Sequence, residues 1–359
     1  MPRIAVIPGD GIGLEVTREA VRVLEAVEAR FATGLELVHW DLGADRYLRD
    51  GVTLSDEEFR ALAEEHDGIL LGALGDPRVP GNEHARDILL GLRFRLDLYV
   101  NHRPCVLADS ALSPLRDVEP FRLDIFRENT EGIYVDLGGT FKEGTPDEIA
   151  IQEDLNTWTG VERIIRAAFD FARTRQRSRV TLVDKANAMP AAGRLWRRAF
   201  RAVASEYDGI RADAVYVDAM AMDLVRRPGD YEVLVTSNLF GDILSDLAAV
   251  VTGGIGLAAS ANLHPGRHAL FEPVHGSAPD IAGTGRANPM GAIACAGLLL
   301  EHVGAHDAAR AVERACQAAL EAGWRTSDLG GRHSTEEVGG WVAARVAGTD
   351  EESEGESEA

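Results

Sequence analysis

The sequence contains little cysteine, almost no lysine and no long apolar run, and each scarcity narrows its structural class. Cys105, Cys295 and Cys316 are its only cysteines. They lie far apart without C-x-x-C spacing, which argues against a disulfide framework and predicts reduced, structural thiols. No run of about 20 apolar residues occurs, so no segment is expected to span a membrane. The N-terminus lacks the basic start and long apolar region of a signal peptide. Together these features predict a cytoplasmic protein.

The formal net charge of −21 limits the partners that the protein can attract. An acidic surface argues against nucleic acid and anionic membrane surfaces. Lys142 and Lys185 are the only lysines, and the other 35 of the 37 Lys and Arg residues are arginine. An amine can lose its proton when its pKa is depressed, whereas a guanidinium cannot. Lysine at position 185 therefore indicates a role that arginine would not serve.

The order of apolar and amphipathic segments indicates the fold class. At 359 residues the chain predicts one large or two intertwined domains. Short apolar runs alternate with amphipathic stretches, which is typical of an α/β protein with a largely parallel sheet. Strands are expected at 3–7, 35–40, 68–72, 97–101, 179–183, 213–217 and 232–236. Helices are expected at about 14–30, 56–65, 84–93, 158–175, 189–206, 240–251, 290–303 and 306–321.

Three segments depart from this alternation. Residues 130–155, rich in Gly, Thr and acidic residues, are expected to form an extended arm or hairpin. Residues 253–290 are expected to be irregular, and function often collects in such loops on a rigid scaffold. Residues 349–359 contain mainly Ser, Glu, Asp and Gly and are expected to form a disordered acidic tail.

The glycine-rich motif P-G-D-G-I-G at residues 8–13 follows an expected strand and opens an expected helix. Its spacing differs from the G-x-G-x-x-G of a Rossmann fold, and no acidic residue ends a second strand at the expected distance. A tight strand-to-helix turn and a glycine loop beside a ligand both remain open.

Three aspartates, Asp218, Asp242 and Asp246, form a candidate metal site. Asp242 and Asp246 are four residues apart, so on a helix they lie on one face. Ligand sets made only of oxygen suit Mg²⁺ or Mn²⁺ rather than zinc. The alternative is a solvated acidic helix face in a chain of strongly negative charge.

Arginines and two proton carriers form the next constellation. Arg93 is expected at a helix end, Arg103 just beyond a strand and Arg127 at the end of another strand, so their forks can meet around a carboxylate. Surface ion pairs are the alternative, and Arg95 is expected to be structural. Tyr134 and Lys185 are candidate proton carriers, because a lysine buried beside a cation can have a lowered pKa and act as a base.

The motif F-E-P-V-H-G-S-A-P-D-I-A-G at residues 271–283 is too polar and turn-rich for a core. An irregular segment of this length usually serves a function. The carboxylate of Asp280 can accept hydrogen bonds from both hydroxyls of a ribose but would repel a 2′-phosphate.

Taken together, these motifs resemble those of the metal-dependent β-decarboxylating dehydrogenases, the family of isopropylmalate, isocitrate, homoisocitrate and D-malate dehydrogenases. The resemblance runs from Ile4 to about Leu329 and includes R-E-N-T-E-G-I-Y, V-D-K-A-N-A-M and N-L-F-G-D-I-L-S-D in family order. It implies an isopropylmalate dehydrogenase-like fold, not a Rossmann fold, with two α/β domains flanking a cleft. The implied cofactor-side domain comprises residues 1–98 and 253–348, and residues 99–252 form the second domain. It also implies a homodimer with shared active sites, in which Lys185 and Asp218 act across the interface.

The resemblance also implies the chemistry. A hydroxy-dicarboxylate, a malate substituted at carbon 3, would bind Mg²⁺ or Mn²⁺ held by Asp218, Asp242 and Asp246. Arg93, Arg103 and Arg127 would bind its carboxylates. Lys185 would take the hydroxyl proton during hydride transfer to NAD, and Tyr134 would reprotonate carbon 3 after CO₂ leaves. Residues implied to bind the cofactor are His275, Gly276, Ser277, Ala278, Asp280 and Asn288.

Substrate choice depends on the helix that precedes Arg93. Leu89 and Leu90 resemble the leucines that contact an isopropyl group, so 3-isopropylmalate, a leucine-pathway substrate, is favoured. Arg86 stands where many isopropylmalate enzymes have glutamate; it could bind a further carboxylate, as in homoisocitrate, or point to solvent. D-malate, tartrate and a specialised-pathway malate also remain open as substrates. A non-catalytic subunit of the family and a plain carboxylate-binding protein remain open as functions.

Overall fold

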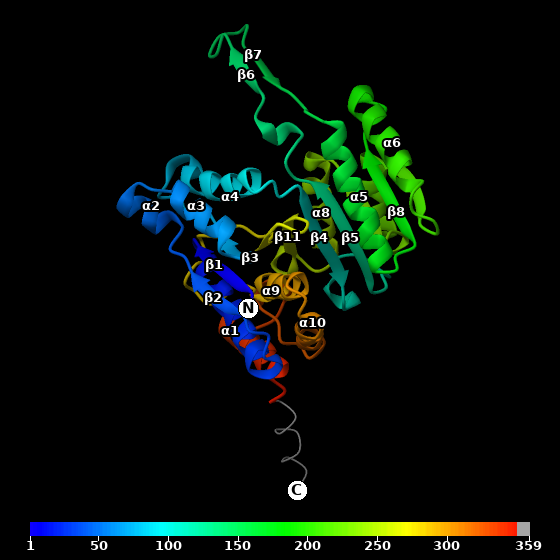
Figure 1. The fold of residues 1–359 in the computed structure, drawn as a ribbon. Coiled ribbons are helices and arrows are strands. Elements are labelled where there is room, and N and C mark those ends of the chain that lie inside the picture. Colours follow the sequence, from blue (N-terminus) through cyan, green and yellow to red (C-terminus); the bar gives the residue numbers. More distant parts are fainter. Residues whose placement is uncertain (350–359) are drawn as a thin grey trace.

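The chain folds around one ten-stranded mixed sheet, which confirms the predicted α/β class (Figure 1). The computed structural model describes residues 1–349, so the predicted acidic tail lies outside the described residues apart from Thr349. The strand order is β2-β1-β3-β12-β11-β4-β5-β10-β8-β9. The strands toward both edges of the sheet pair in parallel. Pairing is antiparallel only in the centre, where β12, β11, β4 and β5 lie side by side.

The sheet strands are β1 (Arg3–Gly9), β2 (Glu36–His39), β3 (Gly68–Ala73), β4 (Val100–Leu107), β5 (Phe121–Glu128), β8 (Arg179–Asp184), β9 (Arg211–Tyr216), β10 (Val233–Thr236), β11 (Ala259–His264) and β12 (His268–Pro273). The helices are α1 (Gly13–Phe31), α2 (Ala44–Asp50), α3 (Asp56–Glu64), α4 (Glu83–Arg95), α5 (Trp158–Thr174), α6 (Pro190–Ala204), α7 (Val217–Arg226), α8 (Asn238–Val251), α9 (Met290–His302), α10 (His306–Glu321) and α11 (Thr335–Ala347). Short 3-10 helices connect several of these elements, and η3 (Ile133–Val135) is the one that enters the site described below.

Buried apolar side chains form separate cores in the two halves of the sheet, one around β1 and β3 and the other around β5, β8 and β10. One pair of clusters draws on α1, α4, β1, β3 and α9–α11, and the other pair on α5, α6, β5, β8 and β10. Ile4 in the first half and Phe169 in the second half are both fully buried. Such separate cores support the division at residues 98/99 and 252/253, which stays a prediction.

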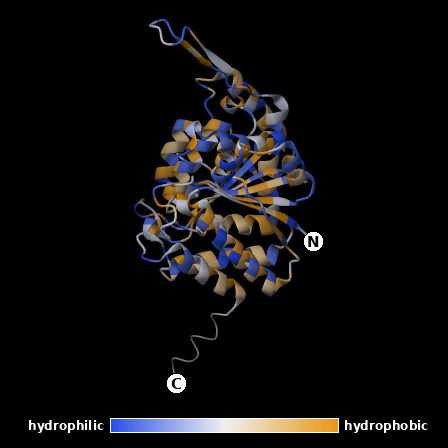
Figure 2. Cartoon of the chain, turned by 90° about the vertical axis from the view of Figure 1, so that its left-hand side faces the viewer, coloured by the Kyte–Doolittle hydropathy of each residue, from blue (hydrophilic) through white to orange (hydrophobic). Residues whose placement is uncertain are grey.

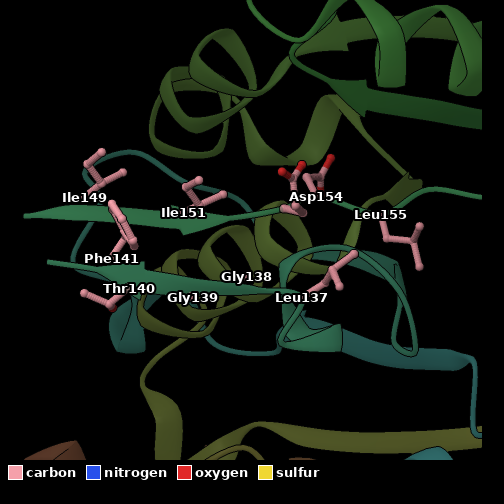
Figure 3. Close-up of a pocket in the computed structure, with 10 residues that line it drawn as sticks. Leu137, Gly138, Gly139, Thr140, Phe141, Ile149, Ile151, Asp154 and Leu155 are labelled. Atoms are coloured by element: carbon pink, nitrogen blue, oxygen red, sulfur yellow. The ribbon is translucent and has the colours of Figure 1, made fainter. Parts of the chain in front are cut away.

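A two-stranded hairpin, β6 (Gly138–Phe141) with β7 (Ile149–Gln152), projects from the half that contains β5, β8 and α5 (Figure 1). Apolar residues occur along it, as the orange stretches of the projecting strands show (Figure 2), and several of their side chains are exposed. Phe141 is 64% exposed and Ile151 55% exposed. The hairpin lines a hollow of about 650 Å³ (Figure 3). The prediction of an arm or hairpin at residues 130–155 is confirmed.

Several sequence predictions differ from the structure. Residues 253–290 are not irregular throughout, because β11 and β12 form a full antiparallel pair there. The strand expected at 97–101 begins at Val100 and continues to Leu107, so Arg103 lies inside it rather than beyond it. Helices α2, α7 and α11 were not predicted. Within residues 1–349, none of the helices combines the length and apolar character needed to cross a bilayer.

Candidate active site

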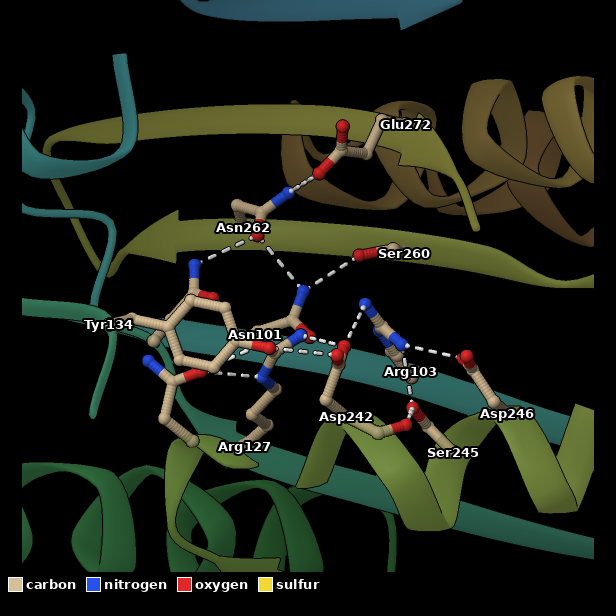
Figure 4. A network of polar contacts seen from close by, with 12 residues as sticks. Asn101, Arg103, Arg127, Tyr134, Asp242, Ser245, Asp246, Ser260, Asn262 and Glu272 are labelled. Carbon is tan, nitrogen blue, oxygen red and sulfur yellow. Dashed lines mark hydrogen bonds and ion pairs between the residues drawn. The ribbon is translucent and has the colours of Figure 1, made fainter. Parts of the chain in front are cut away.

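Helix α8 and the central strands bring two of the three predicted aspartates against two of the predicted arginines (Figure 4). Arg127 Nη1 lies 2.5 Å from Asp242 Oδ1, and Arg103 lies 3.4 Å from Asp242 and 3.3 Å from Asp246. A side chain at Gly241 would come within 2.6 Å of Arg127, so glycine in the N-L-F-G-D motif lets α8 pack on this arginine. Burial raises the pKa of Asp246, because a charged carboxylate is poorly solvated there.

Tyr134 reaches the same carboxylate from η3. Its hydroxyl donates a hydrogen bond to Asp242 Oδ2 at 2.9 Å, and the Arg127 guanidinium lies 5.2 Å from its ring centre. Burial, and then the negative charge of Asp242, raise the pKa of Tyr134. The phenol therefore keeps its proton at neutral pH, as a proton donor requires.

Arg93 is the least satisfied of the three arginines. It is 7% exposed, and its Nε has no hydrogen-bond partner among residues 1–349. Burial lowers its pKa, and Glu272, Arg103 and Asp242 lie near enough to act on its charge. A buried guanidinium without full pairing is costly, so the position favours an anionic ligand. Leu90 lies three residues before Arg93 on α4 and is half-buried, as is Leu89.

The other predicted site residues form a separate group. Lys185 follows β8 and Asp218 lies in the first turn of α7, with Nζ and Oδ1 2.6 Å apart. That contact lowers the pKa of Asp218. No group of three His, Cys, Asp or Glu side chains placed to hold a metal ion is found in residues 1–349. One chain therefore does not bring Asp218 together with Asp242 and Asp246.

The glycine-rich motif is packed against the loop that follows β12. The Ile12 amide donates to Ser277 O at 2.8 Å, and a side chain at Gly11, whose φ is +56°, would collide with the same oxygen. Buried Asp10 accepts hydrogen bonds from the amides of Ala44 and Gly75 at 2.6 and 2.7 Å. The motif is thus a tight turn that contacts the loop containing His275–Asp280, and a place beside a ligand stays a prediction.

Within this loop, His275 has an unused polar atom. It is 9% exposed, burial lowers its pKa, and its Nε2 has no partner among residues 1–349. Gly276, Ser277 and Ala278 follow it, and Asp280 is exposed.

The Asn288 side chain, in contrast, already makes two hydrogen bonds. Its Oδ1 accepts from the Met290 amide and its Nδ2 donates to Asp328, both at 3.0 Å. A primary amide has two N–H donors, so one N–H of Asn288 remains for a ligand.

Sequence reasoning missed a buried polar network beside the arginines (Figure 4). Asn262 Oδ1 accepts from Asn101 at 2.9 Å and from Asn129 at 2.9 Å, while its Nδ2 donates to Glu272 at 2.9 Å. Asn101 also donates to Ser260 at 2.7 Å. Asn129 lies inside the R-E-N-T-E-G-I-Y motif and Asn101 lies two residues before Arg103, and that was the available signal. Asn262 lies in the segment that was expected to be irregular, so no strand pattern pointed to it.

Arg86, which departs from the resemblance, is paired outside the arginine cluster, and so is His102. Arg86 Nη2 lies 2.8 Å from Asp136 Oδ2, with both side chains exposed. His102 Nε2 lies 2.9 Å from the fully buried Asp124. Arg95 pairs with Asp56 and lies over the Phe59 ring, as expected for a structural residue.

Comparison with known proteins shows which family and which relatives the chain resembles in sequence. The family model described as "Isocitrate/isopropylmalate dehydrogenase" matches residues 3–342. The chain is 46% identical over 352 residues to "3-isopropylmalate dehydrogenase" of Thermobifida fusca, covering 96% of this chain and 98% of that protein. It is 48% identical over 347 residues to the protein of the same name from Streptomyces coelicolor, again covering 96% and 98%.

Two solved structures with a similar fold are also dehydrogenases. Isocitrate dehydrogenase from Methylococcus capsulatus superposes with a TM-score of 0.87 at 38% identity, covering 97% of this chain and 100% of that one. A β-decarboxylating dehydrogenase from Thermococcus kodakarensis gives a TM-score of 0.81 at 37% identity, covering 99% and 98%.

Proposed function

This chain belongs to the isocitrate/isopropylmalate dehydrogenase family, and we propose that it oxidatively decarboxylates 3-isopropylmalate, using NAD and Mg²⁺ or Mn²⁺, within leucine biosynthesis. The family assignment makes it a decarboxylating dehydrogenase, of a type that is typically NAD- and metal-dependent. The observation that supports the substrate class is the buried Arg93, whose Nε lacks a partner within residues 1–349, beside Arg103 and Arg127.

The arginines would bind and orient the substrate. Three guanidinium groups can pair with the two carboxylates of a malate while releasing Asp242, which they hold in the free protein. Leu89 and Leu90 would offer apolar contact to an isopropyl group on carbon 3. Because several guanidinium groups would hold the substrate in one orientation, the entropic part of the activation barrier would be lower.

Oxygen ligands fit a hard divalent cation. Asp242 and Asp246 of one chain would hold it, with Asp218 supplied by a second copy. When bound, the cation supplies electrostatic polarisation of the substrate oxygen at carbon 2. Tyr134 would donate its hydroxyl proton to carbon 3, and Lys185 would accept the proton of the substrate hydroxyl.

The loop after β12 fits NAD. His275 has a buried nitrogen without a partner within residues 1–349, and Asp280 is exposed where it can accept from ribose hydroxyls. Gly276, Ser277, Ala278 and Asn288 would complete the cofactor site. NAD, when bound, supplies the hydride acceptor. A 2′-phosphate would meet the negative charge of Asp280, which favours NAD over NADP.

The separation of Lys185 and Asp218 from the arginine cluster supports a homodimer with shared active sites. Exposed apolar side chains on the hairpin and on the α7–α8 face would supply the interface: Leu137, Phe141, Ile149 and Ile151 on the hairpin, and Met222, Val225, Ile243 and Val250 on the helices. Exposed apolar surface of this extent is typical of a contact surface.

The function is tested by following NADH formation with NAD and Mn²⁺ on 3-isopropylmalate, D-malate, tartrate, isocitrate and homoisocitrate, and by repeating the panel with NADP. Preference for 3-isopropylmalate with NAD is expected. Preference for another malate refutes the substrate, and activity only with NADP refutes the cofactor. Asp242→Asn should lose turnover by orders of magnitude, whereas a plain binding protein would lose only affinity.

Sharing of the site has a quantitative test. Lys185→Ala and Asp242→Asn proteins should each be inactive. After they are mixed, unfolded and refolded together, about a quarter of wild-type activity should return, because half of the dimers are mixed and each has one intact site. No recovery, with mixed dimers verified, would show that each chain builds its own site.

A further inference from the structure

The ion pair between Arg86 and Asp136 joins two segments that bear on the substrate site. Arg86 lies on α4, and Asp136 directly follows η3, which carries Tyr134. In Figure 1, α4 lies below the segment that leads into the β6–β7 hairpin. The contact therefore connects the helix that carries Arg93 with the segment that carries the proton donor.

The spacing along α4 places Arg86 at the rim of this site. Residues 86, 90 and 93 recur at four and seven residues, so Arg86, Leu90 and Arg93 share one helix face. Arg93 is buried, Leu90 is half-buried, and the Arg86 side chain is 64% exposed. The face thus runs from a buried cation, past an apolar side chain, to a second cation about 10 Å further along the helix.

Within residues 1–349, the ion pair of Arg86 is the one with Asp136. The neighbouring Asp87 accepts a hydrogen bond from Thr53 at 3.1 Å, on another part of the surface. Asp136 has a φ of +56°, a left-handed conformation that aspartate tolerates better than most residues. That conformation ends η3, so the Asp136 backbone is fixed by the same turn that positions Tyr134.

We propose that Arg86 and Asp136 form a charge-neutral rim that selects against malates whose carbon-3 substituent carries a further carboxylate. The inference rests on the proposed function and specifies its substrate class. Asp136 neutralises Arg86, so the rim offers an extra carboxylate no net attraction, while the apolar surface of Leu90 remains for an alkyl group. Arg86 is then neither a carboxylate receptor nor a side chain free in solvent.

The two members of the pair should affect specificity in opposite directions. Asp136→Asn leaves a positive charge at the rim, whereas Arg86→Gln leaves a negative one. The ratio of kcat/KM for homoisocitrate to kcat/KM for 3-isopropylmalate should rise about fivefold in Asp136→Asn and fall about fivefold in Arg86→Gln at low ionic strength. The double variant, with no charge at the rim, should return to the wild-type ratio. Added salt should shrink both shifts, because the pair is exposed.

A matched control and a second readout keep failures distinguishable. Asp307→Asn removes the partner of Arg310 from an equally exposed pair on α10 and should leave the ratio unchanged. Dissociation constants of the two substrates, measured by calorimetry on each variant, give the same ratio without turnover.

Opposite shifts that vanish in the double variant support the proposal. Unchanged ratios in both variants, or loss of homoisocitrate binding in Arg86→Gln without gain in Asp136→Asn, overturn it. Binding without turnover of any substrate would instead refute the proposed function.

Discussion

Replacing Arg93 with methionine should stabilise the free protein while it abolishes turnover. Arg93 is 7% exposed, burial lowers its pKa, and its Nε has no partner within residues 1–349. Keeping a charge in such a place costs several kcal/mol, and apolar replacements of similar volume at buried ionic positions are often stabilising. We expect the free energy of unfolding to rise by about 1–3 kcal/mol in the absence of ligands.

Arg127→Met is the matched control, because Arg127 is equally buried but fully paired. It is 2% exposed and donates to Asn238 Oδ1 at 3.0 and 2.6 Å and to Asp242 at 2.5 Å. Its removal leaves buried Asn238 Oδ1 without its donor and leaves Asp242 with only Arg103 and Tyr134. The expected loss of unfolding free energy is about 3–5 kcal/mol, as for breaking a buried pair. Two arginines of similar burial should therefore change stability in opposite directions.

The assay is urea unfolding followed by tryptophan fluorescence, at one fixed protein concentration and without divalent ions, because dimerisation and ligands both shift apparent stability. Adding 3-isopropylmalate at about 100 times its dissociation constant should raise the unfolding free energy of the wild type by about 2.7 kcal/mol. Arg93→Met should show no such increase. Destabilisation of Arg93→Met by as much as Arg127→Met would refute the argument, since Arg93 would then be satisfied in the free protein.

Four further predictions address the proton donor, the cation, the cofactor and pH. Tyr134→Phe should lower kcat by about 10²–10⁴ with little change in KM, because only a proton transfer is lost; an unchanged kcat in steady-state kinetics would assign the proton to another group. Mn²⁺ should raise the thermal midpoint of the wild type and of Asp307→Asn but not of Asp246→Asn, measured by scanning fluorimetry; an equal rise in all three would place the cation elsewhere. Asp280→Lys should raise the ratio of NADP to NAD activity at least about tenfold, since about 1.4 kcal/mol of altered charge interaction suffices, and a constant ratio would remove Asp280 from cofactor choice. Burial lowers the pKa of His275, so its folded value lies below the unfolded value of about 6.5; the associated stability is present above that pH and is lost as pH falls. His275→Gln should therefore lose less stability than the wild type between about pH 6.5 and 5, and parallel urea midpoints across that range would contradict the assignment.

Local patterns in the sequence predicted much of the scaffold, and the reason lies in periodicity. Helix α1 and strand β1 appeared nearly at their observed bounds, because apolar residues recur at helical or strand spacing. Helix α8 also placed Asp242 and Asp246 on one face as expected. The β11–β12 pair was missed because its small and polar residues, such as Ser260 and Asn262, face the buried polar network rather than an apolar core.

The site was predicted less completely, because pairing between distant residues cannot be read from local spacing. Motifs identified the arginines and aspartates, yet the contact of Arg86 with Asp136 joins residues 50 positions apart. The network of Asn101, Asn129 and Asn262 likewise depends on which strands become neighbours. Asp218 illustrates a further limit, since its proposed role requires a second copy of the chain.

The packing of α1 against α11 has a consequence for the order of folding during synthesis. Helix α1 packs against α11, and Arg22 reaches Glu336, 314 residues later. At a translation rate of about 5–20 residues per second, α1 waits on the order of tens of seconds for its partner. The core formed by α5, α6 and β8 uses residues close in sequence, so we expect it to form on the ribosome first. During this interval the part of the apolar face of α1 that packs on α9 and α11 stays uncovered, although β1 and β3 are already synthesised. We expect this part of the nascent chain to depend most strongly on chaperones.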